Sequence, residues 1–203
     1  MTNIMTLHSR LRQETRILHE DLERAVQIDE QISTRGRYAA YLVRLWALYA
    51  AAEKSLRPID FSPLGFDYSD RRRSELIESD LRTLGIDPLT LDRGMNLEAP
   101  LNRTIESGLG CVYVLEGSAL GARAMAPTVE ARLGLTKTHG AEFFWGYGEG
   151  GKLLWRTFLA SVNAIDPFSV RAEQVVESAK ATFLFFQRWL PECREKITSS
   201  AVA

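Results

Sequence analysis

Apolar residues recur at spacings of three and four along almost the whole chain, which is the period of an amphipathic helix. Strict alternation at a spacing of two, the mark of a half-buried strand, has little support. The pattern therefore predicts an all-α fold in which several helices bury apolar stripes against one another. The 203 residues are expected to form one domain, with a frayed tail over residues 198–203.

The expected helices are separated by proline and glycine. Pro58, Pro63 and Gly65 mark a loop after the second helix, and Pro167 ends the helix before the last one. The expected ranges are 6–32, 33–56, a charged helix through 71–73 that ends near 85, a long helix over 101–133, a helix that resumes at 152, and a last helix over 168–197.

Charge and composition exclude several classes of protein. Lys and Arg together number 25 against 26 Asp and Glu, so the chain lacks the basic excess of a general nucleic-acid binder. The longest apolar run, Leu45–Ala52, falls far short of the roughly 18 residues that suggest a membrane span. Cys111 and Cys193 have no His or Cys nearby at metal-ligand spacing, which argues against zinc sites and disulfide frameworks. With no basic-then-apolar signal at the start, a cytoplasmic location is expected.

His19 is the residue whose spacing most suggests chemistry. It shares a helix face with Thr15, Leu22 and Val26, and Glu23 follows one turn later. A metal-binding imidazole usually gives its second N–H to a carboxylate, carbonyl or water, and an i+4 glutamate can accept it. A half-buried histidine with a surface partner is the commoner case on the residues alone, so both interpretations stay open.

Glycines are concentrated in the second half of the chain, with ten of the fourteen between Gly108 and Gly151. Gly117 and Gly121 lie four apart and so share one face of the long helix, where they clear a strip of backbone. Close helix–helix packing explains such a pair, and it is the commoner explanation. The alternative is a flat ligand against the strip, with Ser118 nearby. His8 and His139 are expected at surface or loop positions.

Three segments together carry a resemblance to a known family. Residues 11–23, LRQETRILHEDLE, resemble the proximal helix of heme oxygenases. Residues 113–121, YVLEGSALG, resemble the distal helix of the bacterial branch often associated with bacteriophytochromes, and residues 143–155 also resemble that branch. The similarity runs in order over nearly the whole chain.

The resemblance implies a heme sandwiched between a proximal and a distal helix. His19 would be the axial iron ligand, Glu23 its carboxylate partner, and Gly117, Ser118 and Gly121 the distal side. The other residues that the resemblance places around the heme are Arg12, Thr15, Tyr113, Lys152, Arg156 and Phe183. Basic side chains there would suit the propionate groups.

The implied activity is oxidative cleavage of heme b, as substrate and oxygen-activating cofactor, to biliverdin, carbon monoxide and iron. Electrons would come from an external donor, a ferredoxin, a flavodoxin or a reductase, and a bacteriophytochrome is a candidate receiver of the biliverdin. No tightly bound flavin or nicotinamide is expected, because Gly146–Gly151 does not follow a strand in the manner of a GxGxxG fingerprint. Neither nucleic acid nor membrane is expected as a partner.

The sequence departs from the usual heme oxygenase pattern at two positions, and these departures keep alternative functions open. Ser118 stands where many heme oxygenases have an aspartate that organises water, and Ala122 stands where a further glycine is common. A hydroxyl cannot act as a carboxylate, so the source of protons is open and a non-catalytic heme carrier or sensor is the alternative function. A third possibility is a helical protein that never uses heme, as relatives acting on thiamine or quinone precursors do. The triple arginine Arg71–Arg73 is expected to be a solvated helix start, with docking of an acidic redox partner as the other option.

Overall fold

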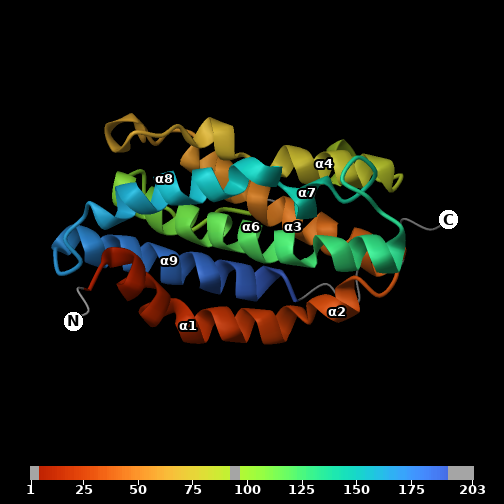
Figure 1. Cartoon of the computed structure of the whole chain (residues 1–203), viewed down its shortest axis with the longest axis horizontal. Coiled ribbons are helices and arrows are strands. Elements are labelled where there is room, and N and C mark those ends of the chain that lie inside the picture. Colours follow the sequence, from red (N-terminus) through yellow and green to blue (C-terminus); the bar gives the residue numbers. More distant parts are fainter. Residues whose placement is uncertain (1–4, 92–96, 192–203) are drawn as a thin grey trace.

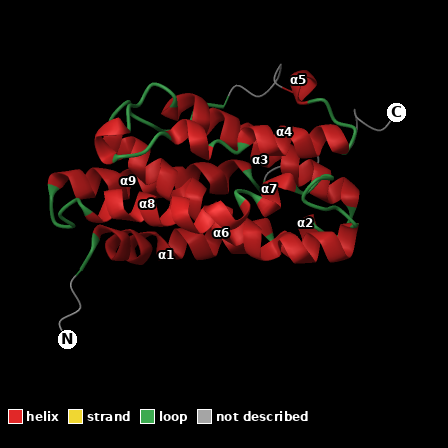
Figure 2. Cartoon of the chain, turned by 45° about the horizontal axis from the view of Figure 1, so that its top comes forward, coloured by secondary structure: helices red, strands yellow, loops and turns green. Residues whose placement is uncertain are grey.

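The computed structural model describes residues 5–91 and 97–191. Within these ranges the chain forms helices and no strand, so the all-α prediction is confirmed (Figure 2). The predicted tail over 198–203, the end of the last helix and Cys193 lie outside the described residues. The helices are α1 (Leu7–Val26), α2 (Ile28–Gln31), α3 (Arg35–Leu56), α4 (Ser74–Thr83), α5 (Pro88–Leu91), α6 (Ile105–Leu133), α7 (Glu142–Trp145), α8 (Gly151–Asn163) and α9 (Val170–Trp189), with 3-10 turns η1 (Ser62–Leu64), η2 (Tyr68–Arg71) and η3 (Gly148–Gly150).

The first expected helix is broken in two. Gln27 adopts a left-handed conformation (φ 47°) between α1 and α2, so the prediction of one helix over 6–32 is wrong at that point. No Gly or Pro marks this break in the sequence. The threonine at the start of α1 caps it well, because the Thr6 side chain accepts from the Ser9 N–H and the Ser9 side chain accepts from the Thr6 N–H.

Three long helices set the shape of the molecule. α1, α6 and α9 run along its longest axis (Figure 1). α9 packs extensively on both α6 and α1, whereas the backbones of α1 and α6 stay apart over most of their lengths and meet through side chains such as His8 and Tyr113. α9 therefore forms a floor beneath two helices that face one another across a gap.

Gly110 explains how α6 and α9 approach so closely. A Cβ atom on Gly110 would lie 2.4 Å from the carbonyl oxygen of Val175 and 2.6 Å from the amide nitrogen of Ala179, both on α9. No side chain fits in that space. This glycine therefore serves helix–helix packing, the role that the sequence offered for Gly117 and Gly121.

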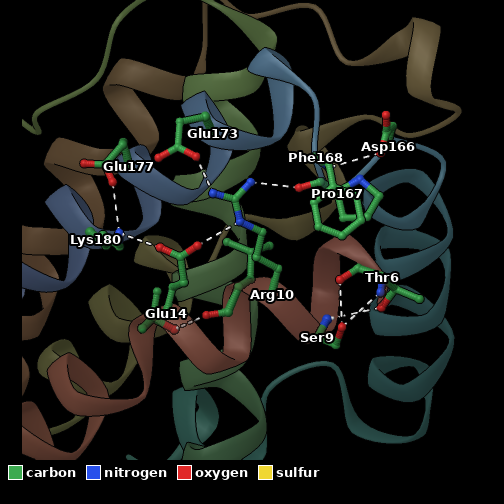
Figure 3. Close-up of polar contacts among 12 residues, drawn as sticks. Thr6, Ser9, Arg10, Glu14, Asp166, Pro167, Phe168, Glu173, Glu177 and Lys180 are labelled. Carbon is green, nitrogen blue, oxygen red and sulfur yellow. Dashed lines mark hydrogen bonds and ion pairs between the residues drawn. The ribbon is translucent and has the colours of Figure 1, made fainter. Parts of the chain in front are cut away.

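A charged cluster ties α1 to α9 (Figure 3). Glu14 accepts hydrogen bonds from Arg10 Nε and Lys180 Nζ, each at 2.7 Å, and these bonds lower the pKa of its carboxyl group. Arg10 also pairs with Glu173 and donates to the carbonyl oxygen of Pro167 at 2.7 Å. The network fixes α1 beside α9 while leaving the opposite side of α1 free to border the gap.

The structure corrects the prediction that the triple arginine Arg71–Arg73 is a solvated helix start. Arg71 and Arg73 are 2% and 1% exposed, so they neither start a solvated helix nor present a docking surface. α4 begins only at Ser74. Arg71 pairs with the buried Glu116 (Nη1 to Oε1 3.3 Å) and donates to the carbonyl oxygen of Leu154 at 3.1 Å, which joins the turn before α4 to α6 and α8. These buried partners lie far away in the sequence, so helical spacing gave no sign of them.

Candidate functional site

A cleft of about 830 Å³ lies between α1 and α6. Its floor includes Phe183 and Phe186 of α9, and Trp155 of α8 lines it as well. Tyr41 and Leu45 of α3, together with the α7 aromatic residues Phe143 and Phe144, add further apolar surface. The α1 wall contains Arg12, Thr15, Arg16, His19, Glu20, Leu22, Glu23 and Val26, and the α6 wall contains Tyr113, Val114, Gly117, Ser118, Gly121, Ala122, Ala124 and Met125.

His19 stands open to this cleft from the α1 wall. Its side chain is 56% exposed, unlike that of an ordinary half-buried histidine, and its ring makes an edge contact with Phe183 (centroids 5.9 Å apart). Nδ1 lies 3.7 Å from Glu23 Oε2. That separation is slightly longer than a hydrogen bond. With Nδ1 directed to Glu23, Nε2 is the atom left to bind a ligand in the cleft.

The glycine strip lies on the opposite wall. No heavy atom lies within 4 Å of a Cβ placed on Gly117 or on Gly121, apart from the helix's own backbone and chain neighbours. The close-packing interpretation is therefore wrong for this pair, in contrast to Gly110. The two glycines bare about 6 Å of helix, one turn, on the side that borders the cleft. A flat ligand can approach this stretch of backbone without meeting a side chain.

Ser118 is joined to a buried tyrosine behind the cleft. Tyr49 Oη contacts Ser118 Oγ, and Ser118 Oγ donates to the carbonyl oxygen of Leu115 at 2.8 Å. Tyr49 also lies within 3.3 Å of the Leu115 oxygen. Burial raises the pKa of Tyr49 to about 12, so its hydroxyl keeps its proton at neutral pH.

Aromatic rings line the cleft beside the start of α1. The Tyr113 and Trp155 rings are tilted by 33° to each other with centroids 6.3 Å apart, and His8 meets Trp155 edge-on at 5.8 Å. His8 is thus half-buried against the Tyr113 and Trp155 rings rather than free on the surface, although it does not itself line the cleft, and burial lowers its pKa. His139 is exposed, as predicted.

The lining matches the chemistry of a porphyrin. Aliphatic and aromatic side chains dominate the cleft, which suits a flat apolar macrocycle, while Arg12 and Arg16 lie together on the α1 wall and suit carboxylates at the macrocycle edge. His19 faces an α6 wall without bulky side chains between Gly117 and Gly121. The donor set, one imidazole with a carboxylate partner, fits a heme iron.

The cleft gathers most of the residues predicted from the sequence. The predicted residues that line it are Arg12, Thr15, His19, Glu23, Tyr113, Gly117, Ser118, Gly121 and Phe183. Lys152 and Arg156 are exposed on α8 and are not among its lining residues, although Trp155 between them is. Their role as heme contacts stays a prediction.

Several residues that line the cleft were not predicted from the sequence. Arg16 follows Arg12 by four positions on the same helix face, a signal that could have been used. Tyr41 and Leu45 belong to an apolar stripe that cannot be told from ordinary core by spacing. Met125 lies one turn beyond Gly121 and extends the α6 wall.

The described ranges, 5–91 and 97–191, also bear on metal-ligand clusters and membrane spans. Among these residues no group of three or more His, Cys, Asp or Glu side chains is arranged to hold a metal ion. None of their helices is both long and apolar enough to span a membrane.

Comparisons with known proteins agree with this geometry. A search of curated proteins gave no match. The fold is similar to the NO- and CO-bound heme oxygenase from Neisseria meningitidis, with a TM-score of 0.78, 20% sequence identity, and coverage of 93% of this chain and 92% of that one. It is also similar to heme oxygenase from Leptospira interrogans (TM-score 0.69, 15% identity, 93% and 100% covered). Heme oxygenase 2 from Chlamydomonas reinhardtii, solved without heme, gives a TM-score of 0.67 at 18% identity, with 93% and 97% covered.

The family itself is established by sequence rather than by these structures, whose identities are too low to show more than the fold. The sequence model of heme oxygenase matches residues 5–192. This range contains His19 in α1, the glycine strip of α6 and the aromatic segment around Phe143. The chain belongs to the heme oxygenase family.

Proposed function

We propose that this protein cleaves heme b oxidatively to biliverdin, carbon monoxide and iron, using dioxygen and electrons from a separate donor protein. Membership of the heme oxygenase family supports heme degradation as the activity. The finer statement, with these products, is our proposal. The bound heme supplies the iron that activates dioxygen and the macrocycle that is oxidised.

One observation carries the proposal furthest: His19 and the glycine strip form opposite walls of the same cleft. His19 is open to the cleft, and a Cβ on Gly117 or Gly121 would meet nothing outside its own helix. An imidazole suits the iron on one side. The bare backbone leaves room for a small ligand on the other side and limits the directions in which it can lie, so regiochemistry becomes a matter of positioning.

The α1 wall would hold the substrate. His19 would bind the iron through Nε2 and donate a hydrogen bond from Nδ1–H to the Glu23 carboxylate, which would keep the ring oriented. Arg12 and Arg16, which line the same wall, would bind the propionate groups by charge-assisted hydrogen bonds. Lys152 and Arg156 stay candidates for the same role from α8.

The hydroxyl pair on the α6 side would handle protons in place of the aspartate that many relatives have. In one arrangement Tyr49 donates to Ser118, and Ser118 donates to the Leu115 oxygen. In the other arrangement Tyr49 donates to the Leu115 oxygen, and the Ser118 proton is free to point into the cleft. Since neither group ionises near neutral pH, water ordered by this pair would deliver the protons.

The electron donor would be a ferredoxin, a flavodoxin or a reductase, as the family resemblance implies. The biliverdin would serve a bacteriophytochrome if the likeness to that branch extends to its biology. Release of iron is the competing physiological purpose.

A heme carrier or sensor is the second candidate function, and Ser118 favours it. Among the described residues that line the cleft, the only carboxylates, Glu20 and Glu23, lie on the α1 wall, and none lies on the α6 wall. Such a protein would bind heme through His19 and release it intact.

A turnover assay separates the two functions. Purified protein is titrated with heme, and ferredoxin, ferredoxin reductase and NADPH are then added in air, with a ferrous-iron chelator present to detect released iron. The oxygenase predicts a Soret band that decays into biliverdin absorption with release of iron. A Soret band that persists, while a known heme oxygenase turns over in the same mixture, would establish the carrier. No Soret band would contradict both.

A further inference from the structure

Arg73 is a buried cation held between aromatic rings. Its side chain is 1% exposed, and its guanidinium carbon lies 4.4 Å from the ring centre of Phe143 and 5.2 Å from that of Tyr147. One terminal nitrogen, Nη2, donates to the carbonyl oxygen of Phe143. Gly146 leaves the space for this group, because a Cβ there would lie 2.6 Å from Nη2 and the backbone φ is +52°. The segment around Phe143 is therefore shaped to receive a guanidinium.

The charge of Arg73 is not neutralised by an ion pair of its own. Nε and Nη1 of Arg73 have no hydrogen-bond partner among the described residues. Three buried carboxylates in this region are engaged elsewhere: Glu116 pairs with Arg71 at 3.3 Å, Glu53 lies 3.7 Å from Arg72, and Asp80 accepts from two backbone N–H groups of α7 at 2.7 and 2.9 Å.

Glu53 is further occupied by α4. It accepts from the Ser74 hydroxyl at 2.5 Å and from the backbone N–H of Arg73 at 2.7 Å. Arg72 is 38% exposed and also pairs with Glu75 at 2.9 Å, so the buried members of the triple arginine are Arg71 and Arg73, and of these only the Arg71 side chain has a carboxylate as a direct partner among the described residues. A buried charge that lacks its own counter-ion acts over a longer distance than a compensated or solvated one, because little solvent screens it.

This charge lies directly behind one wall of the cleft. Phe143 both packs against the Arg73 guanidinium and lines the cleft. The Phe143 ring also meets the Tyr49 ring edge-on at 5.4 Å, and Tyr49 contacts Ser118. Burial raises the pKa of Tyr49 to about 12, and the positive charge of Arg73 opposes that rise more strongly than either Glu53 or Glu116 adds to it, so Arg73 is the charge that acts most on this residue beside the glycine strip.

We propose that Arg73 is a positioning residue with an electrostatic role: it holds Phe143 in the cleft wall and supplies a fixed positive charge that favours anionic over neutral ligands in the cleft. The inference rests on the proposed heme site. It concerns selectivity between small ligands at that site, which the heme-binding residues alone do not determine.

The test compares an anion with a neutral ligand on the ferric heme complex. Azide and imidazole are titrated separately into wild type, Arg73→Met and Arg73→Lys at one fixed ionic strength. Loss of the charge in Arg73→Met should weaken azide binding about tenfold, whereas imidazole affinity changes less than about twofold. Arg73→Lys keeps the charge and should restore most of the azide affinity. Arg73→Gln supplies the same comparison if the methionine variant does not fold.

Arg123→Met is the matched control. Arg123 lies over the Trp145 ring at 4.1 Å in the same region, but it is exposed, so solvent screens its charge. Its removal should leave both affinities unchanged. Unaltered azide affinity in Arg73→Met, or an equal loss of azide and imidazole affinity, would overturn the electrostatic role of Arg73 while leaving the proposed function standing. A wild-type protein that binds no heme would overturn both.

Discussion

Tyr49 and Ser118 illustrate what single residues contribute to this site. Tyr49→Phe removes the hydroxyl that contacts Ser118 and keeps the buried ring. We expect turnover to fall about five- to tenfold, less than the roughly 10²-fold or more of a direct acid–base group, because water can replace part of the contact. Heme affinity should not change. The rate of biliverdin formation at saturating reductant, with a heme titration alongside, measures both quantities.

Tyr38→Phe is the control for this prediction. It also removes a buried tyrosine hydroxyl, one that donates to the Gly140 carbonyl oxygen at 2.9 Å and does not line the cleft. Its stability should fall by about 1 kcal/mol with turnover retained. Equal turnover in wild type and Tyr49→Phe would show that the hydroxyl pair takes no part in proton delivery.

Some of these site residues can be predicted from the sequence and others cannot, for a physical reason. His19 and Glu23 are one turn apart, so helical spacing alone pairs them. Tyr49 and Ser118 are separated by 69 positions and meet only because α3 packs near α6. Arg71 and Glu116 are likewise far apart in the sequence. Their ion pair joins the turn before α4 to α6, so Arg71 is buried although a surface position was expected.

At the scale of one helix, α6 uses its glycines for two opposite purposes. Gly121→Leu places a side chain into open cleft, so the fold should keep its stability or gain about 0.5–1 kcal/mol from better helix propensity, while heme affinity falls at least about tenfold. Gly110→Ala forces a Cβ against the α9 backbone. It should destabilise the fold by about 1–3 kcal/mol, with heme affinity retained in the folded protein.

Urea unfolding and heme titration of both variants check this pair. A Gly121→Leu protein that binds heme with normal affinity would contradict the assignment of this strip to the ligand. Periodicity predicted the helix that carries these glycines, but only the packed structure reveals which glycine faces α9 and which faces the cleft. The break at Gln27 was missed for a related reason, because it has no local signal in the sequence.

At the scale of the whole molecule, Asp80 couples stability to pH. This fully buried carboxylate accepts from the backbone N–H groups of Glu142 and Phe143 at 2.7 and 2.9 Å and so holds the start of α7, whose aromatic residues line the cleft. Burial raises its pKa from 3.8 to about 6. The folded state therefore binds the proton more tightly than the unfolded state does.

The direction of the pH dependence of stability follows from this difference between the folded and unfolded states. The folded pKa lies above the unfolded one, so the stabilisation by the protonated carboxyl is present below pH 3.8 and is lost as the pH rises to about 6. Relative to Asp80→Asn, wild type should lose about 2–3 kcal/mol across this window and show a constant difference above it. Urea unfolding of both proteins at a series of pH values measures the difference. A difference that stays flat, or grows in favour of wild type as the pH rises, would contradict it.

The central claim is that His19 binds heme in the cleft between α1 and α6. Its most direct test is an absorption-monitored heme titration of wild type, His19→Ala and His139→Ala, the last removing an exposed histidine outside the cleft. We expect a saturable Soret band of a histidine-ligated heme at one equivalent in wild type and His139→Ala. In His19→Ala we expect loss of that spectrum and at least about tenfold weaker binding. An unchanged spectrum and affinity in His19→Ala would show that His19 is not the heme ligand.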